Sequence, residues 1–67
     1  MKLPTSKQIK WVRQSAQLTQ TEAANIIHKT LSHWQKLESG TYEISMSDWE
    51  LFLIKTNMQS FYSVISD

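Results

Sequence analysis

The amino-acid sequence predicts a compact all-α bundle of four to five short helices in a single domain, residues 1–67. Three observations predict it: helix-capping motifs recur along the chain, apolar residues recur at helical spacing, and one glycine and one proline leave few turns for a β protein. A chain of 67 residues buries only roughly 60% of its unfolded surface. Without cysteine it cannot form disulfides, so we expect association with a second copy to add stability.

Helix starts are indicated by hydroxyl residues that are followed three positions later by Gln or Glu, because the two side chains can cap each other's backbone N–H groups. Three such capping boxes are present: Thr5 with Gln8, Thr19 with Glu22, and Ser47 with Glu50. Thr30 and Ser60 are candidate caps without the reciprocal partner. We therefore expect helices near 6–16, 20–27, 31–38 and 47–56, and a fifth near 60–65.

The apolar residues within the first three segments form stripes typical of helices with one buried face. The stripes are Ile9, Val12 and Ala16, leading to Leu18; Ala23, Ala24 and Ile27; and Trp34 with Leu37. Gly40 follows the third segment, where a left-handed C-cap favours glycine. Only His28–Thr30 separates the second helix from the third, so the two must cross steeply, as in a helix-turn-helix spanning 20–38. An ordinary αα-corner without DNA binding is the alternative.

Charge is distributed unevenly along the chain, although the formal net charge is only +1. Residues 1–36 hold six basic residues and one acidic residue, a net charge of +5, and residues 37–67 carry −4. This asymmetry favours an anionic partner for the first half, most commonly nucleic acid. The sequence contains no apolar run of membrane-spanning length, and Met1–Pro4 lacks a secretory signal's apolar core, so we expect a cytoplasmic protein.

Two runs of residues carry a family resemblance. The run from Leu18 to Ala24, LTQTEAA, resembles the opening of the Cro/cI (XRE-type) helix-turn-helix family, and the run from Trp34 to Gly40, WQKLESG, resembles its close. Both occur at the family's spacing, with Arg13 upstream, so the resemblance covers about residues 6–56. The second run, followed by WELFL from Trp49, is also similar to small phage and mobile-element regulators, including regulators encoded beside anti-CRISPR genes.

The resemblance implies a role for each matching position. The third helix would enter the major groove of double-stranded DNA, with Trp34 and Leu37 facing inward. Arg13 and Glu38 match a partly buried ion pair that ties the first helix to the third, so Glu38→Ala should destabilise the fold. The base-reading positions are Leu31, Ser32, His33 and Lys36. The backbone-contacting positions are Thr19, Gln20 and Thr21, and the basic residues Lys29, Lys7 and Lys10 are further candidates for phosphate contacts.

Three positions depart from the family pattern. His28 replaces the common turn glycine, which predicts either a positive φ at a histidine or a different turn. Lys29 replaces an apolar turn residue, which indicates a more exposed turn. Leu31 replaces a commonly polar reader, and a leucine can contact a thymine methyl but cannot hydrogen-bond a base. Part of the family's usual base-reading chemistry is therefore missing here.

The sequence gives little indication of metal binding or catalysis. His28 and His33 are five residues apart, which is not the spacing of metal ligands on one helix face, and no cysteine assists them. No glycine-rich phosphate loop is present, and most serines and threonines are interpreted as caps. We therefore expect no metal, no cofactor, no small-molecule ligand and no enzymatic activity.

The last third of the chain carries more apolar residues than one helix face needs. Trp49, Phe52 and Leu53 form one face of the helix near 47–56, and we expect a homodimer interface formed by Leu51, Ile54, Met58 and Phe61, although an intramolecular cap is the alternative. The expected function is a dimeric autorepressor at an inverted-repeat operator. The alternatives are an antitoxin or adaptor that mainly binds a protein partner, and RNA binding through the basic half.

Overall fold

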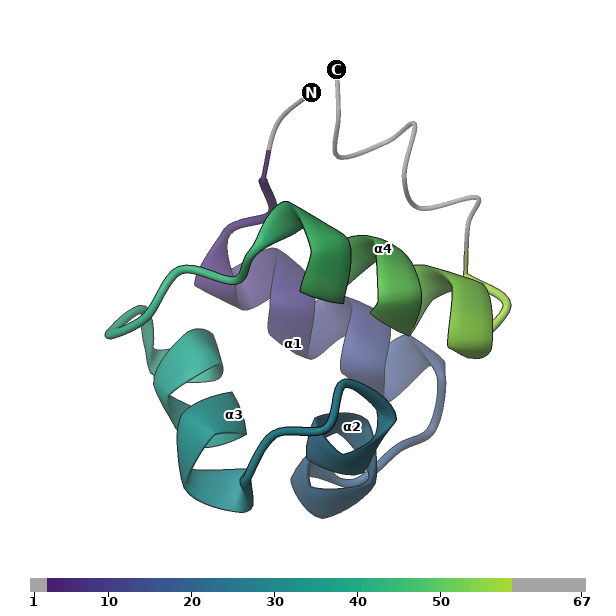
Figure 1. The fold of residues 1–67 in the computed structure, drawn as a ribbon, viewed down its shortest axis with the longest axis horizontal. Helices are drawn as coiled ribbons and strands as arrows, with labels where there is room; N and C mark the ends of the chain where they lie inside the picture. Colours follow the sequence, from purple (N-terminus) through teal and green to yellow (C-terminus); the bar gives the residue numbers. More distant parts are fainter. Residues whose placement is uncertain (1–2, 59–67) are drawn as a thin grey trace.

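The fold was analysed in a computed structural model that describes residues 3–58, and these form four helices without a strand. In chain order they are α1 (Ser6–Ser15), α2 (Gln20–Ile26), α3 (Leu31–Ser39) and α4 (Met46–Lys55), as Figure 1 shows. The predicted all-α class is confirmed, and all four helices lie within one residue of the expected bounds. The expected fifth helix near 60–65, with its candidate cap Ser60, lies outside the described residues.

The four helices enclose a shared interior, with α3 packed against α1 and α2, and α2 also in contact with α4 (Figure 1). The described residues extend 29 × 22 × 19 Å along their principal axes. None of the helices within residues 3–58 has the length and apolar character that crossing a bilayer requires.

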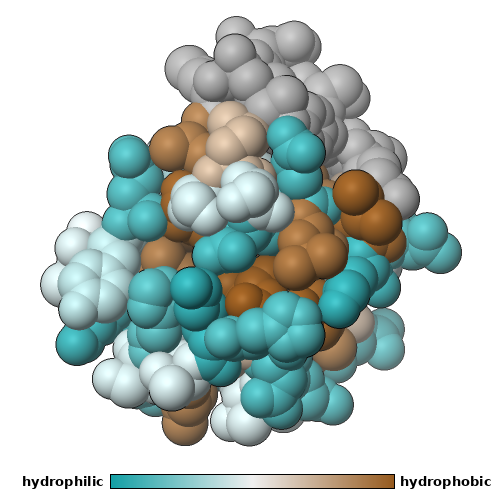
Figure 2. Space-filling view, in the orientation of Figure 1, coloured by the Kyte–Doolittle hydropathy of each residue, from teal (hydrophilic) through white to brown (hydrophobic). Residues whose placement is uncertain are grey.

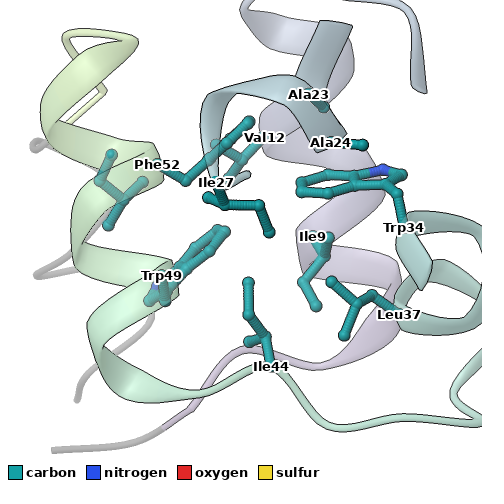
Figure 3. Close-up of a cluster of buried hydrophobic side chains, with 11 residues drawn as sticks. Ile9, Val12, Ala23, Ala24, Ile27, Trp34, Leu37, Ile44, Trp49 and Phe52 are labelled. Carbon is teal, nitrogen blue, oxygen red and sulfur yellow. The ribbon is translucent and has the colours of Figure 1, made fainter. Parts of the chain in front are cut away.

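The core is a single cluster to which every helix contributes (Figure 3). Trp34 of α3 and Trp49 of α4 both pack against Phe52, with ring centroids 5.1 and 6.0 Å from the Phe52 ring centroid. Such aromatic pairs add about 0.5–1.5 kcal/mol each beyond the area they bury. The predicted inward positions are confirmed except for Ala16 and Leu18, which are half-buried, and the loop residue Ile44 joins the core. The remaining buried members are Ile9, Val12, Ala23, Ala24, Ile27, Leu37 and Leu53.

Side-chain caps begin the helices, and three of the predicted caps are confirmed. Thr5 and Thr19 each form the complete reciprocal capping box, with Gln8 and Glu22 respectively. Thr30 accepts a hydrogen bond from the His33 backbone N–H at 3.1 Å and so caps α3. Each of these helices therefore starts where a hydroxyl satisfies an N–H group that lacks a partner within the helix.

The predicted cap of the last described helix is wrong, although the helix lies within one residue of its expected bounds. The cap of α4 is Ser45, whose hydroxyl accepts from the Asp48 backbone N–H at 3.2 Å, and Ser47 lies inside the helix. Ile44, just before the cap, and Trp49, four residues after it, are both buried, which is the arrangement of a hydrophobic staple. Burial of Ile44 therefore favours the earlier start, although Ser47 and Glu50 have the better motif.

Three helices are followed by a non-glycine residue with positive φ: Gln17 (61°), His28 (60°) and Asn57 (61°). Gly40, after α3, has φ 85° and is the predicted left-handed cap. The positive φ at His28 confirms one of the two outcomes expected where a histidine replaces the family's turn glycine. A left-handed conformation costs roughly 1–2 kcal/mol for a residue with a Cβ, so these turns store strain.

We predict that His28→Gly stabilises the protein. Glycine removes the left-handed penalty but loses more chain entropy, so the expected gain in the free energy of unfolding is about 0.5–1 kcal/mol. The measurement is urea unfolding followed by tryptophan fluorescence. The matched control is Gly40→Ala, which should cost about 1 kcal/mol through φ alone, because an added Cβ would meet nothing closer than Ser6 Oγ at 3.7 Å. A destabilised His28→Gly variant would contradict the strain argument.

Candidate nucleic-acid interface

A partly buried network centred on Glu38 sets the orientation of α3. Arg13 of α1 donates from Nε to Glu38 Oε2 and from Nη2 to Oε1 at 3.2 Å, and Trp34 Nε1 donates to Oε2. Gln20, the first residue of α2, donates from Nε2 to Oε1 at 3.1 Å. Arg13 also donates from Nη1 to the Leu18 carbonyl at 2.9 Å. One carboxylate therefore joins α1, α2 and α3, and the ion pair that the family resemblance implied is present.

The network keeps Glu38 ionised. Burial raises the pKa of this carboxyl, but the hydrogen bonds from Arg13, Trp34 and Gln20 and the charge of Arg13 lower it, and the net pKa is below the ordinary value of 4.5. The Glu38 and Arg13 side chains are only 5% and 11% exposed. Charge-assisted hydrogen bonds in such a setting are strong, and losing one partner leaves the other charge buried and unpaired.

The outward side of α3 carries the predicted base-reading positions. Leu31 and Ser32 at the start of the helix and Lys36 near its end are exposed, and His33 is half-buried. Trp34 and Leu37, on the opposite side, are buried. Glu38 is the only acidic residue of α3, and Arg13 holds it away from this outward side. In Figure 2, the lower left of the molecule, where α3 lies, is mostly teal to near-white, with a brown group at the lower edge.

Tyr42 is a candidate functional residue that sequence reasoning missed. It lies in the loop after α3, 43% exposed, with its ring centroid 5.3 Å from that of His33. The Lys36 Nζ atom lies 5.1 Å from the same ring centroid and 3.4 Å from the tyrosine hydroxyl oxygen. The sequence signal was an aromatic residue two positions after the helix-ending Gly40, but only folding of the loop brings it beside α3.

The expected backbone-contacting residues do not all have the same surroundings. Thr19 is occupied as the α2 cap, Gln20 is half-buried against Glu38, and Thr21 is exposed. The Lys29 side chain is exposed, and its Nζ atom lies 4.0 Å from Asp48 Oδ2. Surface ion pairs at such a distance contribute little to stability. Lys7 and Lys10 are exposed on α1. Gln20 therefore has a structural contact that the sequence did not predict.

A carboxylate also lies at the start of α2. Glu22 accepts from the Thr19 backbone N–H at 2.8 Å, and this hydrogen bond together with that of the Thr19 side chain lowers the pKa of Glu22. A negative side chain at a helix N-terminus is favourable for the helix but partly neutralises the positive end that would attract a phosphate. Glu22 is consequently expected to weaken, not strengthen, contacts of α2 with an anion.

The residues expected at a dimer interface differ in how exposed their side chains are. Ile54 is 58% exposed, whereas Leu51 and Met58 are half-buried and pack against the core cluster. Phe61 lies outside the described residues. Trp11 on α1 is also 48% exposed. Of the three expected interface residues that the structure describes, Ile54 is therefore the one with a largely exposed side chain.

The described residues offer little for other ligands. Between the start of α1 and the loop 40–44 there is a hollow of about 160 Å³, below the roughly 300–1,000 Å³ of common ligand pockets. No group of three His, Cys, Asp or Glu side chains within residues 3–58 is arranged to hold a metal ion. No protein-family profile matches the sequence, and no curated protein matches it significantly.

We predict that Glu38→Gln lowers the free energy of unfolding by roughly 2–4 kcal/mol, because it leaves Arg13 without its counter-charge in a nearly buried site. Urea unfolding at neutral pH measures the change. Glu43→Gln, at an exposed position in the α3–α4 loop, is the matched control and should change it by less than about 0.5 kcal/mol. Equal stability of the two variants would show that the negative charge of Glu38 does not stabilise the fold.

Stability should also depend on pH through Glu38. Its pKa is lower in the folded protein than in the unfolded chain, so its stabilising contribution is complete above about 4.5 and is lost as the pH falls through the folded pKa. Unfolding of the wild type and of Glu38→Gln is to be compared from neutral pH down to about 3. We expect the difference between their free energies of unfolding to become smaller as the pH falls. A difference that stays constant with pH would exclude Glu38 as the titrating group.

Proposed function

We propose that this protein is a sequence-specific double-stranded DNA-binding regulator of the Cro/cI (XRE) type, most simply a dimeric autorepressor. In this proposal α2 and α3 form the helix-turn-helix and α3 enters the major groove. An inverted-repeat operator would be bound by two copies, and occupancy of the operator would exclude RNA polymerase.

The observation that carries the proposal is the division of α3 into two sides. Its inward side is fixed by Trp34 and Leu37 in the core and by Glu38 in the network with Arg13. The outward side presents an apolar group, a hydroxyl, an imidazole and an ammonium, without a carboxylate. These groups match what a major groove offers, namely thymine methyls, base-edge donors and acceptors, and nearby phosphates.

The packing of α2 supports the same interpretation. Only residues 27–30 separate α2 from α3, and the two helices are in direct contact. Ala23 and Ala24 are fully buried, so small side chains face the neighbouring helices and permit a close approach. A short second helix packed closely under a third is the arrangement that supports a recognition helix in the helix-turn-helix class.

The number of recognition helices per copy favours two copies on one operator. Each copy has one α3, whereas an inverted repeat has two half-sites about one DNA turn, roughly 34 Å, apart. The described residues extend 29 Å along their longest axis, so two copies related by a two-fold axis fit side by side at this spacing.

The exposed Ile54 and Trp11 favour a second candidate function. In this candidate the protein is an antitoxin or adaptor, and the α4 surface binds a different protein. Analytical ultracentrifugation of the pure protein distinguishes the two: the autorepressor predicts a defined dimer that Ile54→Glu dissociates, whereas the adaptor predicts a monomer or a non-specific aggregate.

The first test of DNA binding is fluorescence anisotropy with DNA from upstream of the protein's own gene, and with duplexes selected from a random library. We expect a preference of roughly a thousandfold over a scrambled duplex and a steep loss of affinity with salt. Equal weak binding to every duplex would contradict sequence-specific recognition and favour the protein-partner function.

Two lysine variants separate base reading from phosphate contact. Lys36→Met should remove a preference of roughly five- to hundredfold at one base pair, the range expected for a specific base contact. Lys29→Met should weaken binding to all duplexes alike and reduce the salt slope by about one. The matched control is Lys55→Met, at the exposed end of α4. If Lys36→Met and Lys55→Met have the same effect, Lys36 does not read DNA.

A further inference from the structure

Tyr42 forms a surface cluster with His33 and Lys36, which we call the Tyr42 cluster. His33 and Lys36 are three residues apart and so lie on one side of α3. The Tyr42 ring approaches both: its plane is tilted by 51° to the His33 ring, and the Lys36 ammonium lies 5.1 Å from its centroid. Two candidate base-reading residues therefore share a contact with a residue outside their helix.

The end of α3 fixes the position of Tyr42. The left-handed Gly40 reverses the chain, and the Tyr42 backbone N–H then donates to the Lys36 carbonyl at 3.1 Å. The Ser39 hydroxyl donates to the same carbonyl at 3.1 Å and lies 2.9 Å from the Thr41 hydroxyl. Backbone and side-chain bonds thus hold the tyrosine on the turn that carries Lys36.

We propose that Tyr42 is a positioning residue that sharpens the DNA sequence preference of α3 by holding the Lys36 ammonium in place. This inference rests on the proposed DNA-binding function. The tyrosine itself need not touch a base, because it acts through the side chain that does.

The chemistry of the two side chains supports this role. A lysine side chain has a flexible stem, and fixing it on a ligand costs up to about 2 kcal/mol of rotamer entropy. The Tyr42 ring and hydroxyl attract the ammonium, which restricts the stem before DNA arrives. The ammonium has three N–H donors, and the hydroxyl takes one of them. The remaining two match the O6 and N7 acceptors of guanine.

Phosphate contact by Tyr42 is the competing role, and it predicts a different pattern. A phosphate contact raises affinity for every duplex without changing base preference. A positioning role changes base preference and depends on the presence of Lys36, so the two variants must be coupled energetically. The base-preference profile therefore separates the roles, whereas affinity for one duplex does not.

The test uses duplexes selected by the wild-type protein and a set with each base pair replaced in turn. Dissociation constants are measured by anisotropy for Tyr42→Phe, Tyr42→Ala, Lys36→Met and the double variant Lys36→Met/Tyr42→Ala. Thermal unfolding of each variant checks that it is folded. Tyr42→Phe removes only the hydroxyl and keeps the ring, so it still tests the proposal if Tyr42→Ala does not fold stably.

We expect Tyr42→Ala to reduce discrimination roughly three- to tenfold at the base pair that Lys36→Met also affects, with Tyr42→Phe intermediate. In the Lys36→Met background Tyr42→Ala should have no further effect on discrimination. The proposal is overturned if Tyr42→Ala weakens binding to all duplexes equally in both backgrounds, if it increases discrimination, or if Lys36→Met changes no base preference. Failure of the wild type to select any duplex overturns the proposed function, and this inference with it.

Discussion

The carboxylate of Glu38 is the point at which three of the four described helices meet. A charged group so nearly buried is stable only when its oxygens are fully hydrogen-bonded, and here both oxygens accept two donors each. The donors come from α1, from the first residue of α2 and from α3 itself. This requirement restricts how far α3 can rotate about its axis, and therefore which residues of α3 face outward.

Trp34 connects this polar network to the apolar core. Its indole nitrogen donates to Glu38, while its ring lies against Phe52, which in turn stacks on Trp49 (Figure 3). The position of α4 is therefore linked to that of α3 through three aromatic rings. Trp34 thus serves two purposes in a small core: its indole N–H makes a hydrogen bond and its ring makes a packing contact.

The outward side of α3 is delimited by the chemistry at its two ends. Thr30 begins the helix just before Leu31 and Ser32, and Gly40 ends it and turns the chain so that Tyr42 returns beside Lys36. Glycine adopts the left-handed conformation there without strain, whereas Gln17, His28 and Asn57 adopt it at a cost. The one unstrained helix end is thus the one that carries the Tyr42 cluster.

The sequence by itself determined the helical class, the first three helix starts, the inward residues of α3 and the pairing of Arg13 with Glu38. These depend on local capping chemistry, on periodicity and on a motif, all of which lie within short runs of residues. The tertiary structure alone decided which serine caps α4, because burial of Ile44 outweighed the better capping motif at Ser47. It also decided that Gln20 contacts Glu38, that Leu51 and Met58 pack partly inward, and that Tyr42 lies over His33 and Lys36. Each of these depends on residues brought together by the packing of whole helices, which no local pattern encodes.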